Sequence, residues 1–366
     1  MQRNLVKMNL ATSTINAQSA DLSTMVELKH GDWNLTDLKD VQQNGLSVFS
    51  CFHCGGGSTM GYKLAGYNVL GGVEIDPKMM ELYKTNHSPK HSYLMGVKEF
   101  CEIPGKELPG ELFELDILDG SPPCSSFSMA GNREKNWGDK KKFREGQAEQ
   151  VLDDLFFDFI DIAKKLKPKV IVAENVKGLI LGNARGYVKQ IFKAFKDAGY
   201  SCQLFLLNAS FMGVPQRRER VFFIARRIST PNLSLDFCEK PIPFHKIEDR
   251  HADMKTLRIT EKLFELWNRC EQGKSLSTVH HKGSYFNARR LHKNKPTYTL
   301  ASGSVSQQLH PTMPRRVSDI EIIRAQTFPQ DYNFLGQDVG YVCGMSVPPF
   351  MMQRLSLEIG KQLFNA

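Results

Sequence analysis

The chain has 366 residues, of which 41% are hydrophobic, and it carries a formal net charge of +9. This length supports one large hydrophobic core and a second, smaller lobe. No apolar run approaches the roughly 18 residues that a membrane-spanning helix needs, and residues 1–45 lack the basic-then-apolar layout of a secretory signal. Composition therefore excludes a disordered or membrane-spanning chain and favours a folded cytoplasmic protein.

The basic excess is concentrated in one part of the chain. Residues 226–316 contain 17 Lys or Arg residues and 8 Asp or Glu residues, an excess of nine positive charges. Within this part, residues 272–318 contain no acidic residue and eight basic ones. Such a segment favours a polyanionic partner such as nucleic acid. A solvated basic face without a partner is the alternative.

The eight cysteines are too irregularly spaced for a disulfide framework, so we expect reduced thiols. Cys51 and Cys54 have the CxxC spacing of a metal or redox site, but no second such pair occurs. His280 and His281 also lack a nearby cysteine pair. We therefore predict no metal, and we interpret the first of these segments as a strand followed by a glycine loop.

From residue 46, short apolar runs alternate with amphipathic segments, which is the pattern of strands and helices in an α/β sheet. Strands are expected at 46–52, 68–75, 112–118, 170–173, 202–207 and 221–225, and helices at 33–41, 59–65, 151–166, 187–198 and 346–364. Beyond residue 226 the alternation fades and then resumes near the C-terminus. We therefore predict an α/β fold with a catalytic domain of residues 46–225 and 337–366, a smaller domain of residues 226–336, and an N-terminal extension of residues 1–45.

A first chemically useful motif, DGSPPC, occupies residues 119–124 at the end of the third expected strand. Ligands of open α/β sheets gather at the carboxyl ends of strands, and the two prolines stiffen the turn. A thiol at Cys124 suits covalent attack on an electrophilic ring carbon. A buried, inert cysteine explains this motif alone equally well.

Two further motifs place charged side chains after apolar strands. Glu174 ends the run 170–173, where desolvation would raise its carboxyl pKa towards values useful for sharing a proton with a heterocyclic nitrogen. In the segment QRRER, strand alternation puts Gln216, Arg218 and Arg220 on one side, where guanidinium groups could bind phosphate or a pyrimidine carbonyl. The alternatives are a glutamate that caps a helix or pairs with a base, and an edge strand of solvated arginines.

In this order, the segments resemble the cytosine carbon-5 DNA methyltransferases of bacteria and phages. The similarity runs from Leu46 to Phe364 and also includes RRVSDIE at 315–321, QTFP at 326–329 and GMSVPP at 344–349. The resemblance implies a Rossmann-like, S-adenosylmethionine-dependent methyltransferase fold. It also implies that the second, smaller domain recognises the target sequence in duplex DNA.

The resemblance implies a covalent mechanism on a cytosine flipped out of the duplex. The thiolate of Cys124 would attack carbon 6, while Glu174 holds the exocyclic amine and ring nitrogen and Arg218 holds the carbonyl edge. Carbon 5 would then take the methyl group of S-adenosylmethionine. Loss of the ring hydrogen and of Cys124 would release the product.

The resemblance also implies which residues bind cofactor and DNA. S-adenosylmethionine would be held by Phe52, Cys54, Gly55, Gly56, Gly57, Glu74, Ile75, Asp119, Pro122, Ser346 and Val347, with Glu74 on the ribose hydroxyls. DNA would be contacted by Gln216, Arg220, Lys282, Arg289, Arg290, Lys293 and Lys295. We expect the basic loop 125–146 to be disordered without DNA and to close over its backbone when a base is flipped.

Three positions depart from the family pattern. Cys54 stands where glycine is usual, Met345 replaces the usual asparagine, and Gly96-Val97 replaces a common aspartate. We expect these changes to alter affinity for S-adenosylmethionine, unless other groups such as Asp76 compensate for them. The expected partner is duplex DNA, a cognate restriction endonuclease is a further candidate, and the chain should be a monomer. The alternatives are a transfer RNA cytosine-5 methyltransferase and a catalytically impaired DNA-binding relative.

Overall fold

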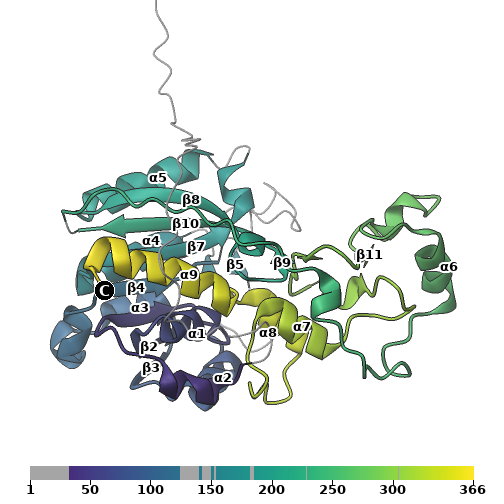
Figure 1. The fold of residues 1–366 in the computed structure, drawn as a ribbon. Helices are drawn as coiled ribbons and strands as arrows, with labels where there is room; N and C mark the ends of the chain where they lie inside the picture. Colours follow the sequence, from purple (N-terminus) through teal and green to yellow (C-terminus); the bar gives the residue numbers. More distant parts are fainter. Residues whose placement is uncertain are drawn as a thin grey trace, which may run out of the picture.

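The computed structural model describes residues 33–123, 140–141, 150–151, 154–181, 185–227, 229–303 and 305–366. Within these residues, a twisted sheet with helices on both faces forms the main body, and a smaller lobe that contains α6 and β11 projects from one side (Figure 1). None of the described helices is both long and apolar enough to cross a membrane.

The main sheet has seven strands in the order β3-β2-β1-β4-β7-β10-β8, and β10 runs antiparallel to both of its neighbours. From β1 the chain continues to β2 and β3 on one side of it and then crosses to β4 on the other side. The strand order therefore reverses between β1 and β4, which makes this position the topological switch point of the sheet. The strands are β1 Ser47–Cys51, β2 Asn68–Glu74, β3 His91–Leu94, β4 Ile117–Gly120, β7 Val170–Val176, β8 Ser201–Asn208 and β10 Glu219–Arg226.

Helices bury both faces of this sheet because alternate strand residues are apolar on both sides. Val172 and Phe222 belong to one core, while Ile171 and Phe223 belong to the other. The first core is closed by α1 Gly57–Leu64, α2 Pro77–His87, α7 Asp319–Gln326, α8 Val339–Met345 and α9 Pro349–Ile359, and the second by α3 Val97–Glu102, α4 Leu155–Leu166 and α5 Arg185–Asp197.

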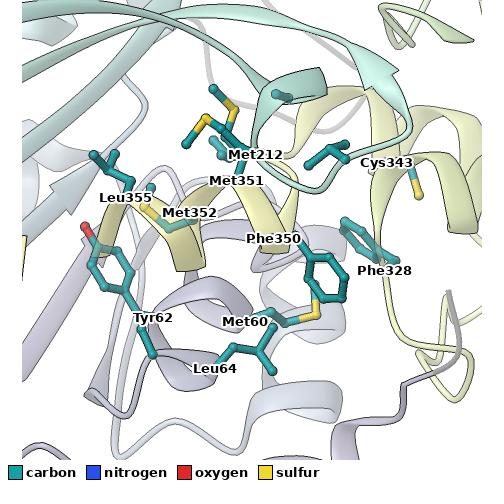
Figure 2. Close-up of a cluster of buried hydrophobic side chains, with 14 of the residues drawn as sticks. Met60, Tyr62, Leu64, Met212, Phe328, Cys343, Phe350, Met351, Met352 and Leu355 are labelled. Carbon is teal, nitrogen blue, oxygen red and sulfur yellow. The ribbon is translucent and has the colours of Figure 1, made fainter. Parts of the chain in front are cut away.

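The C-terminal helix α9 packs across α1, so the end of the chain closes the core that begins at the glycine loop. Met351, Met352 and Leu355 of α9 are fully buried in the same cluster as Met60 and Tyr62 of α1 (Figure 2). This packing holds residues 346–348, which immediately precede α9, next to the start of α1.

The α/β pattern expected from the sequence is confirmed, and three elements begin at least three residues later than expected. The expected strand 112–118 is a 3-10 turn, Gly110–Phe113, followed by β4 only from Ile117, because Asp116 turns its carboxylate to the Ser47 backbone amide at 2.8 Å. The helix expected from residue 151 begins at Leu155, and the terminal helix begins at Pro349. Residues 33–41 form a 3-10 helix, Leu35–Asp40.

The small lobe has its own hydrophobic core. The residues of this core span a shorter part of the chain than the expected domain of residues 226–336. It is built from α6 Glu261–Arg269, β11 Arg289–Arg290 and β13 Gln308–Leu309 around Ile259, Leu266, Trp267, Cys270, Leu276, Ala288 and Leu309. Leu233, Phe244, Ile322 and Phe328 instead lie in the first core of the main body. Apolar residues at both ends of the expected domain therefore belong to the main body.

A buried ion pair lies where the small lobe returns to the main body. The guanidinium of Arg315 binds the Glu321 carboxylate through two bonds of 2.6 and 2.9 Å, and both side chains are almost fully buried. Glu321 also accepts from the backbone of Ser318, which caps α7. One of the eight basic residues of the acid-free segment is therefore a structural cation with no access to a partner.

Candidate active site

The loops that carry the sequence motifs leave the sheet at one edge. Cys51 at the end of β1 pairs with Val73 of β2 on one side and with Gly120 of β4 on the other, and Gly120 pairs with Ala173 of β7. The glycine loop, Glu74, the proline turn and Glu174 therefore lie at the carboxyl ends of four adjacent parallel strands, where ligands of such sheets bind.

Glu74 is fixed at the end of β2 by backbone amides. Its Oε2 accepts from the amide of Cys54 at 3.0 Å, and its Oε1 accepts from Ile75 at 2.9 Å and Asp76 at 3.0 Å. Burial raises its pKa, and these three hydrogen bonds oppose that shift. The bonds fix the orientation of the carboxylate and leave acceptor capacity on both oxygens, as a group that receives two ribose hydroxyls requires.

The glycine loop is shaped by the protein around it. Gly56 has a φ of +80°, and a Cβ there would lie 2.1 Å from Nε2 of His87. A Cβ on Gly57 would lie 2.2 Å from the carbonyl oxygen of Val347. Side chains are therefore excluded at both positions by contacts within the chain, and the GMSVPP segment seats directly on the loop.

Cys54, the departure from the usual glycine, adopts a φ of +48° and places its Sγ 3.5 Å from Sδ of Met79. Burial raises the pKa of its thiol to about 12, with the Glu74 charge adding to the shift, so the thiol stays protonated and is a poor nucleophile. Cys51 lies in the second core. Within the described ranges, no three His, Cys, Asp or Glu side chains converge as a metal site would.

Two side chains that the sequence analysis did not identify, Tyr332 and His87, contact the backbone of the glycine loop. The carbonyl of Gly55 accepts from the hydroxyl of Tyr332 at 2.7 Å and lies 3.2 Å from Nε2 of His87. Burial lowers the pKa of His87 to about 3, so its ring is neutral and donates to this carbonyl. Tyr332 follows the QTFP motif closely, and this position was the only indication of its role. Its contact with Gly55 could not be predicted, because the two residues are far apart in the sequence.

Asp119 is expected to contact the cofactor, but the structure directs its side chain inwards. The carboxyl is 2% exposed and accepts from Ser50 Oγ at 2.7 Å and from the Tyr62 hydroxyl at 3.3 Å. Burial raises its pKa to about 7, and the charge of Glu174 adds to the shift. We reassign Asp119 to holding β4 against β1 and α1, because its oxygens face these internal donors.

The proline turn after β4 is anchored to the neighbouring strand. The side-chain amide of Asn175 donates to the carbonyl of Pro122 at 3.0 Å, and both residues are buried. Asn175 thus links the turn to the strand that carries Glu174. Cys124 follows Pro123 directly in the sequence but lies outside the described residues, as does the loop 125–146 apart from Lys140 and Lys141 of the short strand β5, which pairs with β6 Gln150–Val151.

Glu174 has an arginine partner, and that partner is Arg220. Its Oε1 lies 2.8 Å from Nε of Arg220, and only 11% and 12% of the two side chains is exposed. In the antiparallel β7/β10 pair, Glu174 faces Phe222 and Arg220 faces Val176, so the charged residues are diagonal neighbours on one face of the sheet. The expectation that Arg220 contacts DNA is therefore replaced by a role beside Glu174.

Arg218, expected to hold the base, instead joins two segments of backbone. Its guanidinium donates to the carbonyl of Leu300 at 3.0 Å and to that of Gly344 at 3.1 Å, and the side chain is 2% exposed. Burial lowers its pKa, and the nearby Arg220 charge adds to that shift. Since both terminal nitrogens bind carbonyls within the chain, we reassign Arg218 to a structural role.

Gln216, expected to contact DNA, is also fully buried. Its amide nitrogen donates to Oε1 of Gln326 at 2.7 Å, and its oxygen accepts from the backbone of Leu300 at 2.9 Å. Gln326 in turn donates to the carbonyl of Ser346. The first half of QRRER therefore ties the GMSVPP segment and residue 300 to the main body, and we no longer assign Gln216 to DNA.

Replacing Arg218 with methionine should lower the free energy of unfolding by about 2 kcal/mol, because two carbonyls lose a charged donor. Urea unfolding monitored by circular dichroism measures this loss. Arg227→Met is the matched control, since Arg227 is exposed and its bond to the carbonyl of Lys167 lies at the surface. That control should stay within about 0.5 kcal/mol of wild type. Equal stability of the two variants would contradict the structural role.

The remaining DNA candidates lie in the small lobe and differ in exposure. Lys282, Lys293 and Lys295 are exposed. The guanidinium of Arg290 stacks 4.0 Å from the Trp267 ring and donates to three carbonyls of the lobe, so the structure places it as an internal support. We therefore no longer assign Arg290 to DNA.

Comparison with known proteins places this geometry in a family. The model of the C-5 cytosine-specific DNA methylases matches residues 46–361. The chain belongs to this family. Among its relatives, the Type II methyltransferase M.FnuDI of Fusobacterium nucleatum is 29% identical over 325 residues, covering 79% of this chain and 86% of that protein. The Type II methyltransferase M1.HphI of Haemophilus parahaemolyticus is 27% identical and covers 87% and 88%.

Solved structures share the fold of this chain. A structure described as a DNA modification methyltransferase encoded within an E. coli prophage superposes with a TM-score of 0.64, covering 87% of this chain and 99% of that one. Its sequence identity is 19%, so the likeness concerns the fold alone. The Rossmann-like methyltransferase fold predicted from the sequence is confirmed.

Proposed function

We propose that this protein methylates carbon 5 of a flipped cytosine within a specific duplex DNA sequence, with S-adenosylmethionine as methyl donor. The observation that carries the proposal is the buried Glu174–Arg220 pair, which lies at the carboxyl edge of the sheet beside the proline turn. A carboxylate and a guanidinium held side by side can bind the amine side and the carbonyl side of one pyrimidine ring.

In this proposal, Glu174 binds the exocyclic amine of cytosine and shares a proton with its ring nitrogen. Arg220 uses Nε to hold Glu174 and NH1 to bind the carbonyl of Glu219 at 2.9 Å, which leaves NH2 for the carbonyl oxygen of the base. The thiolate of Cys124 attacks carbon 6, and Glu174 and Arg220 stabilise the charge that develops on the ring. The carbonyl contact first expected of Arg218 thereby passes to Arg220.

The residues at the β1 and β2 ends fit S-adenosylmethionine. Glu74 offers an oriented carboxylate for ribose hydroxyls, and the loop 52–57 together with Ser346 and Val347 leaves no room for side chains at its two final glycines. When bound, S-adenosylmethionine supplies an electrophilic methyl group. Phe52, Cys54 and Ile75 are partly exposed at the same edge and are the further side chains we assign to it.

We further propose that the protein acts as a cytoplasmic monomer on duplex DNA and belongs to a restriction-modification system with a partner endonuclease. The support is the Type II naming of the relatives and the basic surface of the small lobe. Lys282, Lys293 and Lys295 are the lobe cations that we assign to phosphate.

Bisulfite sequencing of DNA from a host that expresses the protein tests the proposal and identifies the target sequence. We expect protected cytosines within one recurring sequence, and none in cells carrying the Glu174→Gln variant. Bisulfite-converted host DNA without protected cytosines, at normal protein levels, would contradict methylation of DNA.

A further inference from the structure

One tyrosine between the two lobes is shared by two arginines. Tyr298 lies in β12 Thr297–Tyr298, which pairs with β9 Gln216–Arg217 and so sets Tyr298 opposite Arg217. The guanidinium carbons of Arg217 and Arg289 lie 4.4 and 4.5 Å from the centre of its ring. The tyrosine hydroxyl donates to the carbonyl of Gly273, which fixes the ring. We call Arg217, Tyr298 and Arg289 the arginine–tyrosine stack.

The two positive charges of the stack are not neutralised within the described part of the chain. No carboxylate there forms an ion pair with Arg217 or Arg289, whereas Arg220 and Arg315 each have a glutamate. Nε of Arg217 is buried and has no hydrogen-bond partner among these residues. Each guanidinium group of the stack therefore carries a positive charge that no carboxylate of the described residues balances, and a phosphate can supply the missing anion.

An exposed aromatic ring continues the stack towards solvent. Phe286 is 69% exposed, the highest value among the large apolar side chains described, and its ring centre lies 5.9 Å from the Arg289 guanidinium. Its position is fixed, because Ser275 Oγ lies 2.7 Å from the Phe286 carbonyl and 3.2 Å from that of Tyr285. Tyr285 itself adopts a φ of +68°, a conformation that costs a bulky residue energy.

We propose that the arginine–tyrosine stack and Phe286 form one DNA-contacting surface, in which the guanidinium groups bind backbone phosphates and Phe286 stacks on a nucleotide base. This inference rests on the proposed function and specifies how the small lobe holds its substrate. In a duplex the faces of the bases are covered by their neighbours, so an apolar side chain reaches a base as a wedge that partly unstacks one base step, while neighbouring arginines bind the phosphates.

The position of the surface relative to the active site supports this assignment. Arg217 is three residues before Arg220, which lies at the start of β10 beside Glu174. Phe286 and Arg289 both belong to the acid-free segment 272–318, so a DNA phosphate meets no repelling carboxylate from that segment. The segment QRRER therefore connects the stack, through Arg217, to the strand that carries Arg220.

The test uses the full-length protein and a fluorescent duplex that carries the sequence identified by bisulfite sequencing. We expect Phe286→Ala to weaken binding about 5- to 150-fold, with Phe286→Trp close to wild type. Arg289→Gln should weaken binding and reduce the slope of log affinity against log salt by about 1. Phe264→Ala is the matched control, because Phe264 is a 42% exposed phenylalanine of the same lobe, stacked on Trp267, and it should bind as wild type does.

The outcomes separate this inference from the proposed function. If wild type methylates and binds the duplex but Phe286→Ala binds equally well, or no worse than Phe264→Ala, the surface is wrong and the proposed function stands. An unchanged salt slope for Arg289→Gln would also overturn the phosphate contact. If wild type binds an RNA of the same sequence, or a transfer RNA, but does not bind the duplex, both proposals fail. Equal thermal stability of the Phe286 variants and wild type excludes misfolding.

Discussion

Replacing Cys124 with serine should abolish methyl transfer and leave DNA binding intact. A serine hydroxyl is far less acidic than a thiol and is a weaker nucleophile towards carbon 6 of cytosine, so we expect a rate loss of at least about a thousandfold. Incorporation of tritium from labelled S-adenosylmethionine into DNA measures the rate, and a gel-shift assay measures binding.

The control for Cys124 is another cysteine of the same chain. Cys238 is free and exposed, so Cys238→Ser tests whether loss of any accessible thiol affects the enzyme. That variant should methylate at the wild-type rate. Methylation by Cys124→Ser at a rate near wild type would remove Cys124 as the nucleophile. Loss of DNA binding in the same variant would instead point to misfolding or to a role in DNA contact.

Replacing Glu174 with glutamine should lower kcat about 100- to 1000-fold, because the amide cannot share a proton with the ring nitrogen and no longer forms an ion pair with Arg220. Arg220→Gln should cause a loss of similar size. If the two residues act as a unit on one base, the double variant should lose little more than either single variant. Single-turnover methylation with saturating duplex measures all three rates.

An exposed ion pair between Lys177, which follows β7, and Glu219, which begins β10, provides the control for Glu174 and Arg220. Lys177 and Glu219 lie 2.9 Å apart, but 38% and 42% of their side chains is exposed. Glu219→Gln should therefore change the rate by less than about twofold, since exposed pairs contribute little. Full additivity of the Glu174 and Arg220 substitutions would contradict their joint action on the base.

The sequence was sufficient to predict most of the central sheet. Strands such as 170–173 and 221–225 are buried on both faces and therefore form continuous apolar runs, which are distinct from the amphipathic helices between them. The start of β4 was less predictable because Leu112 and Leu115 are buried without being in the strand. An apolar run in the sequence indicates that its residues are buried, but it does not show where the strand begins. That start depends on polar contacts such as the one between Asp116 and the Ser47 amide.

The roles of the arginines in QRRER could not be predicted, because alternation in one strand assumes that the strand is continuous. The structure interrupts it at Arg218, since Gln216 and Arg217 pair with β12 while Glu219 begins β10. The segment that supplies β12 is about 80 residues away in the sequence. For this reason the sequence suggested Arg218 as the residue that holds the base, and the structure places Arg220 beside Glu174.

The roles of buried polar side chains also could not be predicted from the sequence. Asp119 follows an apolar strand in the same way as Glu174, yet it accepts hydrogen bonds from Ser50 and Tyr62 inside the fold, whereas Glu174 has Arg220. The same limit applies to Gln216 and Gln326, whose amides pair across about 110 residues of sequence. Whether a polar residue faces a ligand or an internal partner depends on such distant contacts.

A covalent trap tests the central claim most directly. Duplex DNA carrying 5-fluorocytosine in the target sequence is incubated with the protein and S-adenosylmethionine, beside an RNA of the same sequence and the same modified base. Because fluorine cannot be eliminated as a proton is, the Cys124 adduct persists through denaturing electrophoresis. We predict a covalent complex of wild type with the DNA and none with Cys124→Ser. Capture by RNA alone, or capture of the serine variant, would contradict a DNA cytosine-5 methyltransferase that acts through Cys124.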